Sequence, residues 1–108
     1  AGKCNSSESG IGRTTPVGKY SPHGDSPYGV ADMAGNVWEW CRSKFKQYPY
    51  DASDGRENLG GDDALRIVRG GSWYNNRWHC RAACRNGSDP AYFHFNIGFR
   101  AALSPLSS

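Results

Sequence analysis

The sequence Arg69-Gly70-Gly71-Ser72-Trp73 opens the segment that decides the fold, and Ile97-Gly98-Phe99-Arg100 closes it. A double glycine permits positive φ and a close approach of the backbone, so we expect a tight turn there. The apolar residues of Leu65–Arg69 predict a short strand before this turn, and the alternation over Ile97–Leu103 predicts a last strand. Asn, Tyr, Phe, His, Asp, Ser and Gly crowd the segment between the two ends.

A second landmark lies upstream, at Gly35-Asn36-Val37-Trp38-Glu39-Trp40. It begins with a predicted tight turn, and the alternation over Val37–Cys41 predicts a strand with both Trp side chains on one face. Glu39 falls on the other face, beside apolar residues. A buried carboxylate without a partner is costly, so Glu39 needs a positive charge nearby.

The rest of the chain is typical of short strands joined by long loops. Ala1–Tyr28 is predicted to be irregular, and Arg42–Ala64 to be a long surface loop. Arg77–Arg85 is predicted to be a strand and Asn86–Asn96 a loop. No stretch shows the periodicity of an amphipathic helix. Long loops in a small domain are usually functional, so we look for a site on them.

Length and charge limit the function further. The chain has 108 residues, which suffice for one small domain. Its net charge is +3 and its Lys and Arg residues are scattered, which argues against nucleic-acid binding. No apolar run is long enough to cross a bilayer, so membrane insertion is not expected.

The four cysteines leave the redox state open. They are Cys4, Cys41, Cys80 and Cys84, and no CxxC pair points to a zinc ribbon. Two disulfides with three possible pairings are compatible with this count, and so are free thiols in a reducing compartment. The localisation is therefore open, and paired cysteines would favour the cell surface or secretion.

The motifs RGGSW, GNVWEW and GFR, in this order and spacing, resemble the C-terminal half of the formylglycine-generating-enzyme, or sulfatase-modifying-factor, domain. The resemblance runs from about Thr14 to Leu103. It implies an α+β fold of the C-type lectin type, loop-rich with short antiparallel strands, of which residues 1–108 form the C-terminal portion. Most helices of the family lie in the preceding half. That half would precede this chain, come from a separate partner chain, or be missing from a minimal version.

The resemblance also implies a calcium site around the turn before Trp38. Its ligands would be the side chains of Asp32 and Glu39 and the backbone carbonyls of Gly35 and Val37. Such oxygen ligands suit a hard cation like calcium. The alternative is that Glu39 pairs with an arginine and that Asp32 caps a turn.

The family's enzyme oxidises a substrate cysteine with copper(I) held by a Cys-x4-Cys pair after the RGGS turn. Counted from Ser72, the two positions are Asn75 and Cys80. Asn cannot supply the soft thiolate that copper(I) prefers, so copper and oxidase activity are not expected. A formylglycine-generating-type oxidase, in which Cys80 would be the catalytic residue, remains the alternative function, together with an inactive structural member.

The family also includes the variable proteins of diversity-generating retroelements. These elements mutate adenines, and changing the first two bases of Asn codons yields Tyr, Phe, His, Asp, Ser, Gly, Cys and others, but never Lys, Gln, Glu, Met or Trp. Between residues 74 and 96 only Trp78 falls outside the reachable set. The candidate positions are Tyr74, Asn75, Asn76, His79, Cys84, Asn86, Gly87, Ser88, Asp89, Tyr92, Phe93, His94, Phe95 and Asn96.

This composition resembles that of antibody loops, in which rigid aromatic area is combined with adaptable hydrogen bonding. The sequence therefore predicts a ligand-binding surface built from Tyr74–His79 and Asn86–Asn96, with a protein or cell-surface molecule as ligand. The alternative is a family loop whose composition arose by chance.

Overall fold

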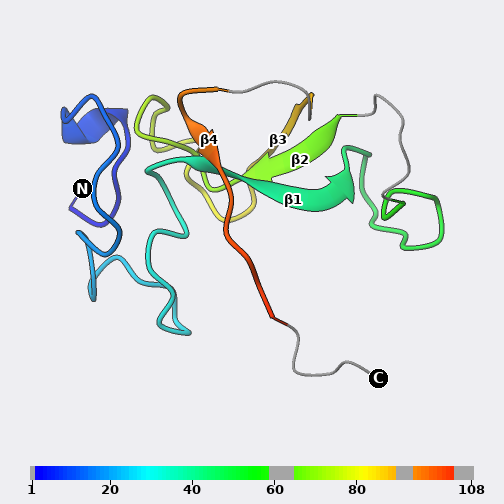
Figure 1. The fold of residues 1–108 in the computed structure, drawn as a ribbon, viewed down its shortest axis with the longest axis horizontal. Helices are drawn as coiled ribbons and strands as arrows, with labels where there is room; N and C mark the ends of the chain where they lie inside the picture. Colours follow the sequence, from blue (N-terminus) through cyan, green and yellow to red (C-terminus); the bar gives the residue numbers. More distant parts are fainter. Residues whose placement is uncertain (1, 59–64, 90–93, 104–108) are drawn as a thin grey trace.

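The computed structural model describes residues 2–58, 65–89 and 94–103, and its centre is one small sheet (Figure 1). The strands are β1 (Trp38–Lys44), β2 (Arg66–Arg69), β3 (Arg85–Ser88) and β4 (Ile97–Gly98). Their order in the sheet is β3-β2-β1-β4. β1 and β2 are antiparallel, as are β2 and β3, whereas β4 runs parallel to β1.

The register of the strands gives the sheet two different faces. Trp40 lies opposite Val68, and Val68 lies opposite Asn86. Because side chains alternate along a strand, these residues share a face with Trp38. The core of this face is Trp38, 4% exposed, and Val68, 2% exposed. The predicted strand around Trp38 is therefore confirmed, and it extends three residues beyond Cys41 to Lys44.

Asparagines tie the N-terminal segment to the turn before β1. The Asn36 N–H donates to the carbonyl of Asn5 at 2.8 Å, and its side chain accepts from the Thr15 N–H at 2.9 Å. Asn36 has a φ of 69°, which asparagine tolerates better than most residues. At Gly35 a Cβ would lie 2.5 Å from the Asn5 carbonyl oxygen, so this close approach requires glycine.

Two expectations for the second half are wrong. Turns, rather than a strand, occupy Arg77–Cys84, and β3 lies in the segment predicted to be a loop. The polar sequence of β3 carries no alternation, and its pairing with β2 makes it a strand. The last strand is also shorter than the predicted Ile97–Leu103, since it covers only Ile97–Gly98, and the Phe99 side chain that its alternation would bury is 79% exposed.

The predicted surface loop is confirmed over residues 45–58, whereas its first three residues belong to β1, and the loop surrounds a buried cation. Arg56 is 3% exposed. Its guanidinium donates to the Asp54 carboxylate at 2.8 Å and to the carbonyls of Gln47 and Pro49 at 3.3 and 3.2 Å. Without Arg56, this segment would lack the cation that its carboxylate and carbonyl groups surround.

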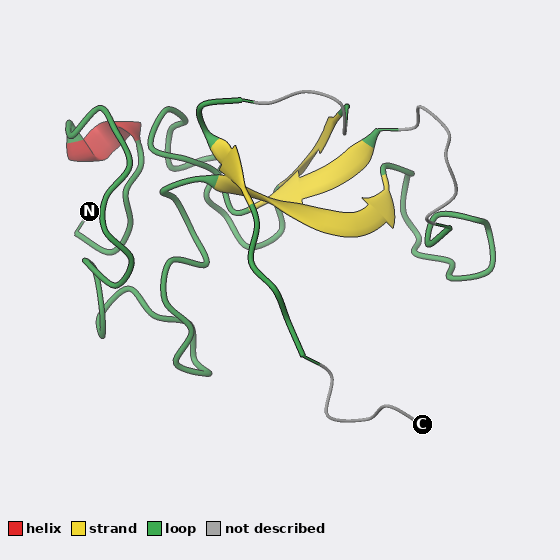
Figure 2. Ribbon diagram, viewed as in Figure 1, coloured by secondary structure: helices red, strands yellow, loops and turns green. Residues whose placement is uncertain are grey.

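Helix is scarce in the part of the chain that the structure describes. It contains one three-residue 3-10 helix, η1 (Ser7–Ser9), drawn red in Figure 2. The strands expected of the predicted α+β class are thus present, which is consistent with a C-type lectin-like fold. The helices expected of that class are not shown by the described residues. Within residues 2–58, 65–89 and 94–103, no helix has the length and hydropathy needed to cross a membrane.

Candidate functional site

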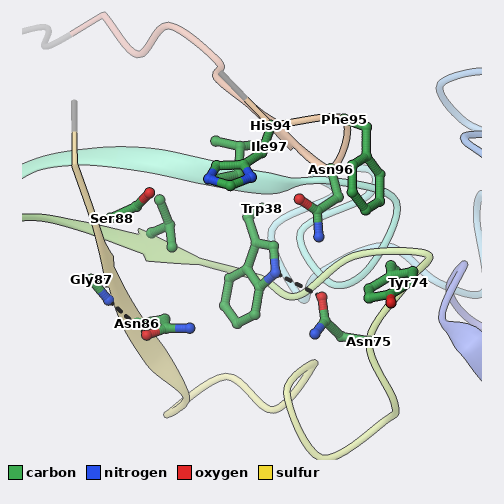
Figure 3. Close-up of a pocket in the computed structure, with 11 residues that line it drawn as sticks. Trp38, Tyr74, Asn75, Asn86, Gly87, Ser88, His94, Phe95, Asn96 and Ile97 are labelled. Atoms are coloured by element: carbon green, nitrogen blue, oxygen red, sulfur yellow. Dashed lines mark hydrogen bonds between the residues drawn. The ribbon is translucent and has the colours of Figure 1, made fainter. Parts of the chain in front are cut away.

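A cavity of about 340 Å³ opens on the Trp38 face of the sheet (Figure 3). Its floor is formed by Trp38, Val68 and Ile97 from three neighbouring strands. Its walls are residues predicted from the sequence to bind ligand, namely Tyr74, Asn75, Asn86, Gly87, Ser88, His94, Phe95 and Asn96. We call this cavity the Trp38 pocket. The sequence pattern did not identify its floor, since those three residues looked like ordinary core.

A hydrogen-bonded network below the rim fixes the turn that follows Gly71. The indole N–H of Trp38 donates to the Asn75 side-chain oxygen at 2.8 Å, drawn as a dashed line in Figure 3. The Ser72 hydroxyl donates to the same oxygen at 2.6 Å and accepts from the Asn96 amide at 3.2 Å. Ser72 is fully buried. Asn75 and Asn96 therefore support the pocket as well as line it.

Aromatic rings form the exposed rim. Tyr74 is 62% exposed and Phe95 is 63% exposed, and their ring centroids lie 5.3 Å apart at nearly right angles. The Trp73 ring packs behind both, 5.8 Å from Tyr74 and 5.4 Å from Phe95. Edge-on packing of this kind holds rings in place without solvent shielding. The rim is thus a rigid apolar surface that faces solvent.

The opposite wall is the edge strand β3. Asn86 and Ser88 lie on the same face as Val68, and Asn86 is exposed. Gly87 is different, because a Cβ at this position would lie 3.1 Å from the Phe45 ring. This wall therefore presents polar side chains on both sides of a glycine at which a side chain would crowd the Phe45 ring.

Two predicted residues of the preceding turn lie outside the Trp38 pocket. Asn76 is exposed, and its side-chain oxygen accepts the N–H of Trp78 at 3.1 Å. His79 is half-buried and packs edge-on against Trp38, with 6.0 Å between the ring centroids. Its Nδ1 is buried and has no hydrogen-bond partner among the described residues.

The other predicted positions fall elsewhere. Cys84 is half-buried near Cys80, and Asp89 follows β3 and is half-buried. Tyr92 and Phe93 lie outside the described residues.

The predicted calcium ligands surround the turn before β1, and Glu39 has a protein partner there. Arg100 donates from Nε to both Glu39 oxygens at 2.8 and 2.9 Å, and from Nη2 to Oε2 at 2.7 Å. The same guanidinium donates to the carbonyls of Ala31 and Asp32 at 2.8 and 2.9 Å. The positive charge that Glu39 needs is therefore supplied by Arg100.

The Asp32 carboxylate also has a partner, since it accepts the Gly18 N–H at 3.0 Å. This is the arrangement expected without a cation, and a calcium ion at Glu39 would face the charge of Arg100. Within the described ranges no three His, Cys, Asp or Glu side chains gather as they would around a metal. The predicted calcium site needs only two carboxylates together with the carbonyls of Gly35 and Val37. The absence of a three-residue cluster therefore does not test this site, and calcium remains a prediction.

Comparison with known sequences decides the family. Residues 2–105 match the family described as "Sulfatase-modifying factor enzyme 1-like domain". The chain belongs to this family. The resemblance predicted from the three motifs is thereby confirmed.

Relatives of this sulfatase-modifying-factor domain include active and inactive proteins. A formylglycine-generating enzyme of Streptomyces coelicolor is 38% identical over 102 residues, 91% of this chain and 32% of that protein. The bovine "Inactive C-alpha-formylglycine-generating enzyme 2" is 30% identical, over 93% of this chain and 30% of its own length. Treponema denticola variable protein 1 has a similar structure, with a TM-score of 0.69, 25% identity, and coverage of 91% of this chain and 34% of that one. The chain thus spans about a third of the length of the relatives it matches.

The cysteine chemistry of the domain departs from the enzyme's. Asn75 lies where the resemblance expects the first cysteine of the copper-binding pair, and its side-chain oxygen accepts hydrogen bonds from Trp38 and Ser72. Burial, followed by the neighbouring Cys4 thiol, raises the pKa of Cys80 to about 12, so its thiol is protonated at neutral pH. No spacing pattern in the sequence indicated that Cys4 would lie beside Cys80.

A second cavity, of about 550 Å³, lies on the Glu39 face of the sheet. Glu39 and Arg69, which are paired across β1 and β2, line it together with Cys41. Met33, Ala34 and Ala82 add apolar surface. Motif analysis gave no sign of this cavity.

Proposed function

We propose that this domain binds a protein or cell-surface ligand at the Trp38 pocket, and that the pocket wall is diversified as in the variable proteins of diversity-generating retroelements. One observation carries the proposal. Eight of the 14 candidate positions come from separate segments of the chain and line one cavity. A chance composition gives no reason for this convergence in space.

The pocket has an exposed rim and a buried support beneath it, and this separation suits the recognition of different ligands. Tyr74 and Phe95 would insert into the ligand as rigid aromatic anchors, which dominate the energetics of many interfaces. Asn86 and His94 are exposed and would adapt the polar contacts from one ligand to another. Ser72 and Trp38 lie beneath them and would keep the turn in place while the rim changes.

The likeness to Treponema denticola variable protein 1 supports this proposal. The bovine relative, which is called inactive, supports a non-enzymatic role for part of the family.

A display library tests the proposal directly. Tyr74, Asn86, His94 and Phe95 are randomised together, and the fraction of soluble, protease-resistant variants is counted. We expect most variants to fold, because surface changes usually alter stability by about 0.5 kcal/mol or less, and we expect selection against a panel of purified proteins to enrich binders.

The matched control randomises the floor and its support, Trp38, Val68, Ser72 and Ile97, and most of its variants should fail to fold. Equal failure of both libraries, or a rim library without any binder, would disprove the proposal. Sequencing of the source DNA provides a second test: a reverse transcriptase and a near-copy of the Trp73–Arg100 coding segment should lie nearby.

The Streptomyces coelicolor relative favours a second candidate, a formylglycine-generating-type oxidase that acts on peptide cysteine. Asn75 and the protonated Cys80 thiol oppose it. We expect no aldehyde when the protein is incubated with a cysteine-containing sulfatase peptide, copper and oxygen. A formylglycine mass in that peptide would favour the oxidase over ligand binding.

A further inference from the structure

Cys4 and Cys80 lie side by side although almost the whole chain separates them. The two thiols are within hydrogen-bonding reach of each other, and Cys84 is close enough to act on Cys80 electrostatically. All four cysteines are reduced in this structure, and each is half-buried. Two adjacent thiols with partial access to solvent can react with small molecules and with each other.

Backbone contacts on the N-terminal side hold Cys4 in this place. The carbonyl of Asn5, the next residue, accepts the Asn36 N–H at 2.8 Å, and Asn5 is 1% exposed. The Ser7 N–H donates to the Asn75 carbonyl at 2.8 Å. The segment that carries Cys4 is therefore already attached to the turn of the Trp38 pocket.

Contacts on the other side hold Cys80. A Cβ at Gly71 would lie 2.7 Å from the Cys80 sulfur and 2.9 Å from the His79 carbonyl oxygen. Gly71 thus leaves the space that the Cys80 side chain fills. Glu8 joins the two segments once more, since its carboxylate accepts the Arg77 N–H at 3.0 Å.

We propose that Cys4 and Cys80 form a reversible disulfide by exchange with a small-molecule disulfide such as glutathione disulfide. The bond clamps the N-terminal segment onto the turn that carries Tyr74 and Asn75. This inference concerns a covalent modification and holds whether or not the Trp38 pocket binds a ligand.

The exchange balances as two thiol–disulfide steps. The Cys4 thiolate attacks glutathione disulfide, its S–S bond breaks, and one glutathione thiolate leaves and takes up a proton. Cys80 then loses its proton to solvent and attacks the Cys4 sulfur, which releases the second glutathione. Two protein thiols are oxidised to one disulfide, and one glutathione disulfide is reduced to two thiols.

The burial of Cys80 shapes the kinetics of the pair. A thiol whose pKa is about 12 is rarely a thiolate, so the second step is slow. A thiol of high pKa is also a poor leaving group, so reduction by attack on the Cys4 sulfur, which must expel Cys80, is slow. We therefore expect a disulfide that forms slowly and resists reduction.

Tryptic mapping can detect this bond without ambiguity, because Arg81 separates Cys80 from Cys84. Reduced protein is treated with glutathione disulfide at about pH 8, the remaining thiols are alkylated, and the peptides are identified by mass spectrometry. We expect the peptide Cys4–Arg13 to be linked to the peptide Trp78–Arg81. The oxidised protein should also melt at least about 5 °C higher, because the bond closes a long loop of the unfolded chain.

Three single variants serve as controls. Cys4→Ser and Cys80→Ser should lose both the linked peptide and the rise in Tm, and circular dichroism shows whether they fold. Cys41→Ser should keep both, because the thiols that act on Cys80 are those of Cys4 and Cys84, although Cys41 lines the same cavity as Cys80. A Cys80–Cys84 link, glutathione retained as a mixed disulfide, or four thiols that are all still alkylated would each overturn the proposal.

Discussion

Asn75, at the position where the resemblance expects a thiol, has a structural role. Its side-chain oxygen accepts the indole N–H of Trp38 and the hydroxyl of Ser72. Both donors are in buried side chains, and a buried donor without an acceptor costs about 1–3 kcal/mol. Asn75 therefore supports the turn and the floor of the Trp38 pocket.

We therefore predict that Asn75→Ala lowers the free energy of unfolding by about 1–3 kcal/mol. Urea denaturation followed by tryptophan fluorescence measures the change. The neighbouring exposed variant Asn76→Ala is the control and should change stability by about 0.5 kcal/mol or less. Equal effects of the two variants would show that the Trp38 hydrogen bond contributes nothing.

Calcium is tested at Glu39. If calcium binds the folded chain only, excess chelator should lower the Tm of the wild-type protein, because a ligand of the folded state stabilises it by mass action. We expect this decrease in the wild type and none in Glu39→Gln, which lacks a carboxylate ligand. If chelator does not change the Tm of the wild-type protein, Glu39 is held by its ion pair with Arg100 alone and no calcium binds there.

At the scale of elements, the segment 45–58 depends on the Arg56 cation. Its hydrogen bonds hold the pKa of Asp54 at about 2, below the usual value of 3.8. The Ser43 and Tyr50 hydroxyls similarly lower the pKa of Glu57. A carboxyl whose folded pKa is lowered stabilises the fold fully above its unfolded pKa, and this stabilisation is lost as the pH falls through the folded value.

We predict that the wild-type Tm falls steeply as the pH is lowered from about 4 to about 2. Asp54→Asn should melt at a lower temperature near neutral pH, and its Tm should depend less on pH in this range. Thermal melts of both proteins across the range measure the difference. Parallel Tm profiles would exclude Asp54 as the titrating group.

The elements also show why sequence patterns succeed and fail here. β1 and β2 carry alternating or clustered apolar residues, so their strands were predictable. β3 reads Arg-Asn-Gly-Ser, and only its pairing with β2 reveals it. Most residues of the pocket wall were predictable from the composition of the segment and the reach of Asn codons. The proximity of Cys4 to Cys80 was not predictable, because it depends on long-range folding that no local sequence signal encodes.

For the whole molecule, the cavity on the Glu39 face suggests a surface for a further chain. The relatives are about three times longer than this chain, and Met33, at 50% exposed, leaves apolar surface open beside Trp40. We propose that the other portion of the domain packs there, as preceding chain or as a separate partner.

The chain of residues 1–108 alone should then bind an apolar fluorescent dye on this face. Met33→Asp should reduce the dye signal without lowering the Tm, since the side chain is half-exposed. Val17→Asp, on an 85% exposed residue outside this cavity, should leave the signal unchanged. Equal signals from all three proteins would place the dye elsewhere.

The contact between Gly87 and Phe45 has a consequence for inheritance. A template Asn codon at position 87 would yield glycine in only part of the progeny, and other products would crowd the Phe45 ring. Asparagine codons begin with two adenines, and Asn75 and Asn96 lie in the same interval of the gene. Each round of mutagenesis would then produce some variants that lose the hydrogen bonds around Ser72 and fail to fold. The number of folded variants would therefore be smaller than the number of mutable adenines implies.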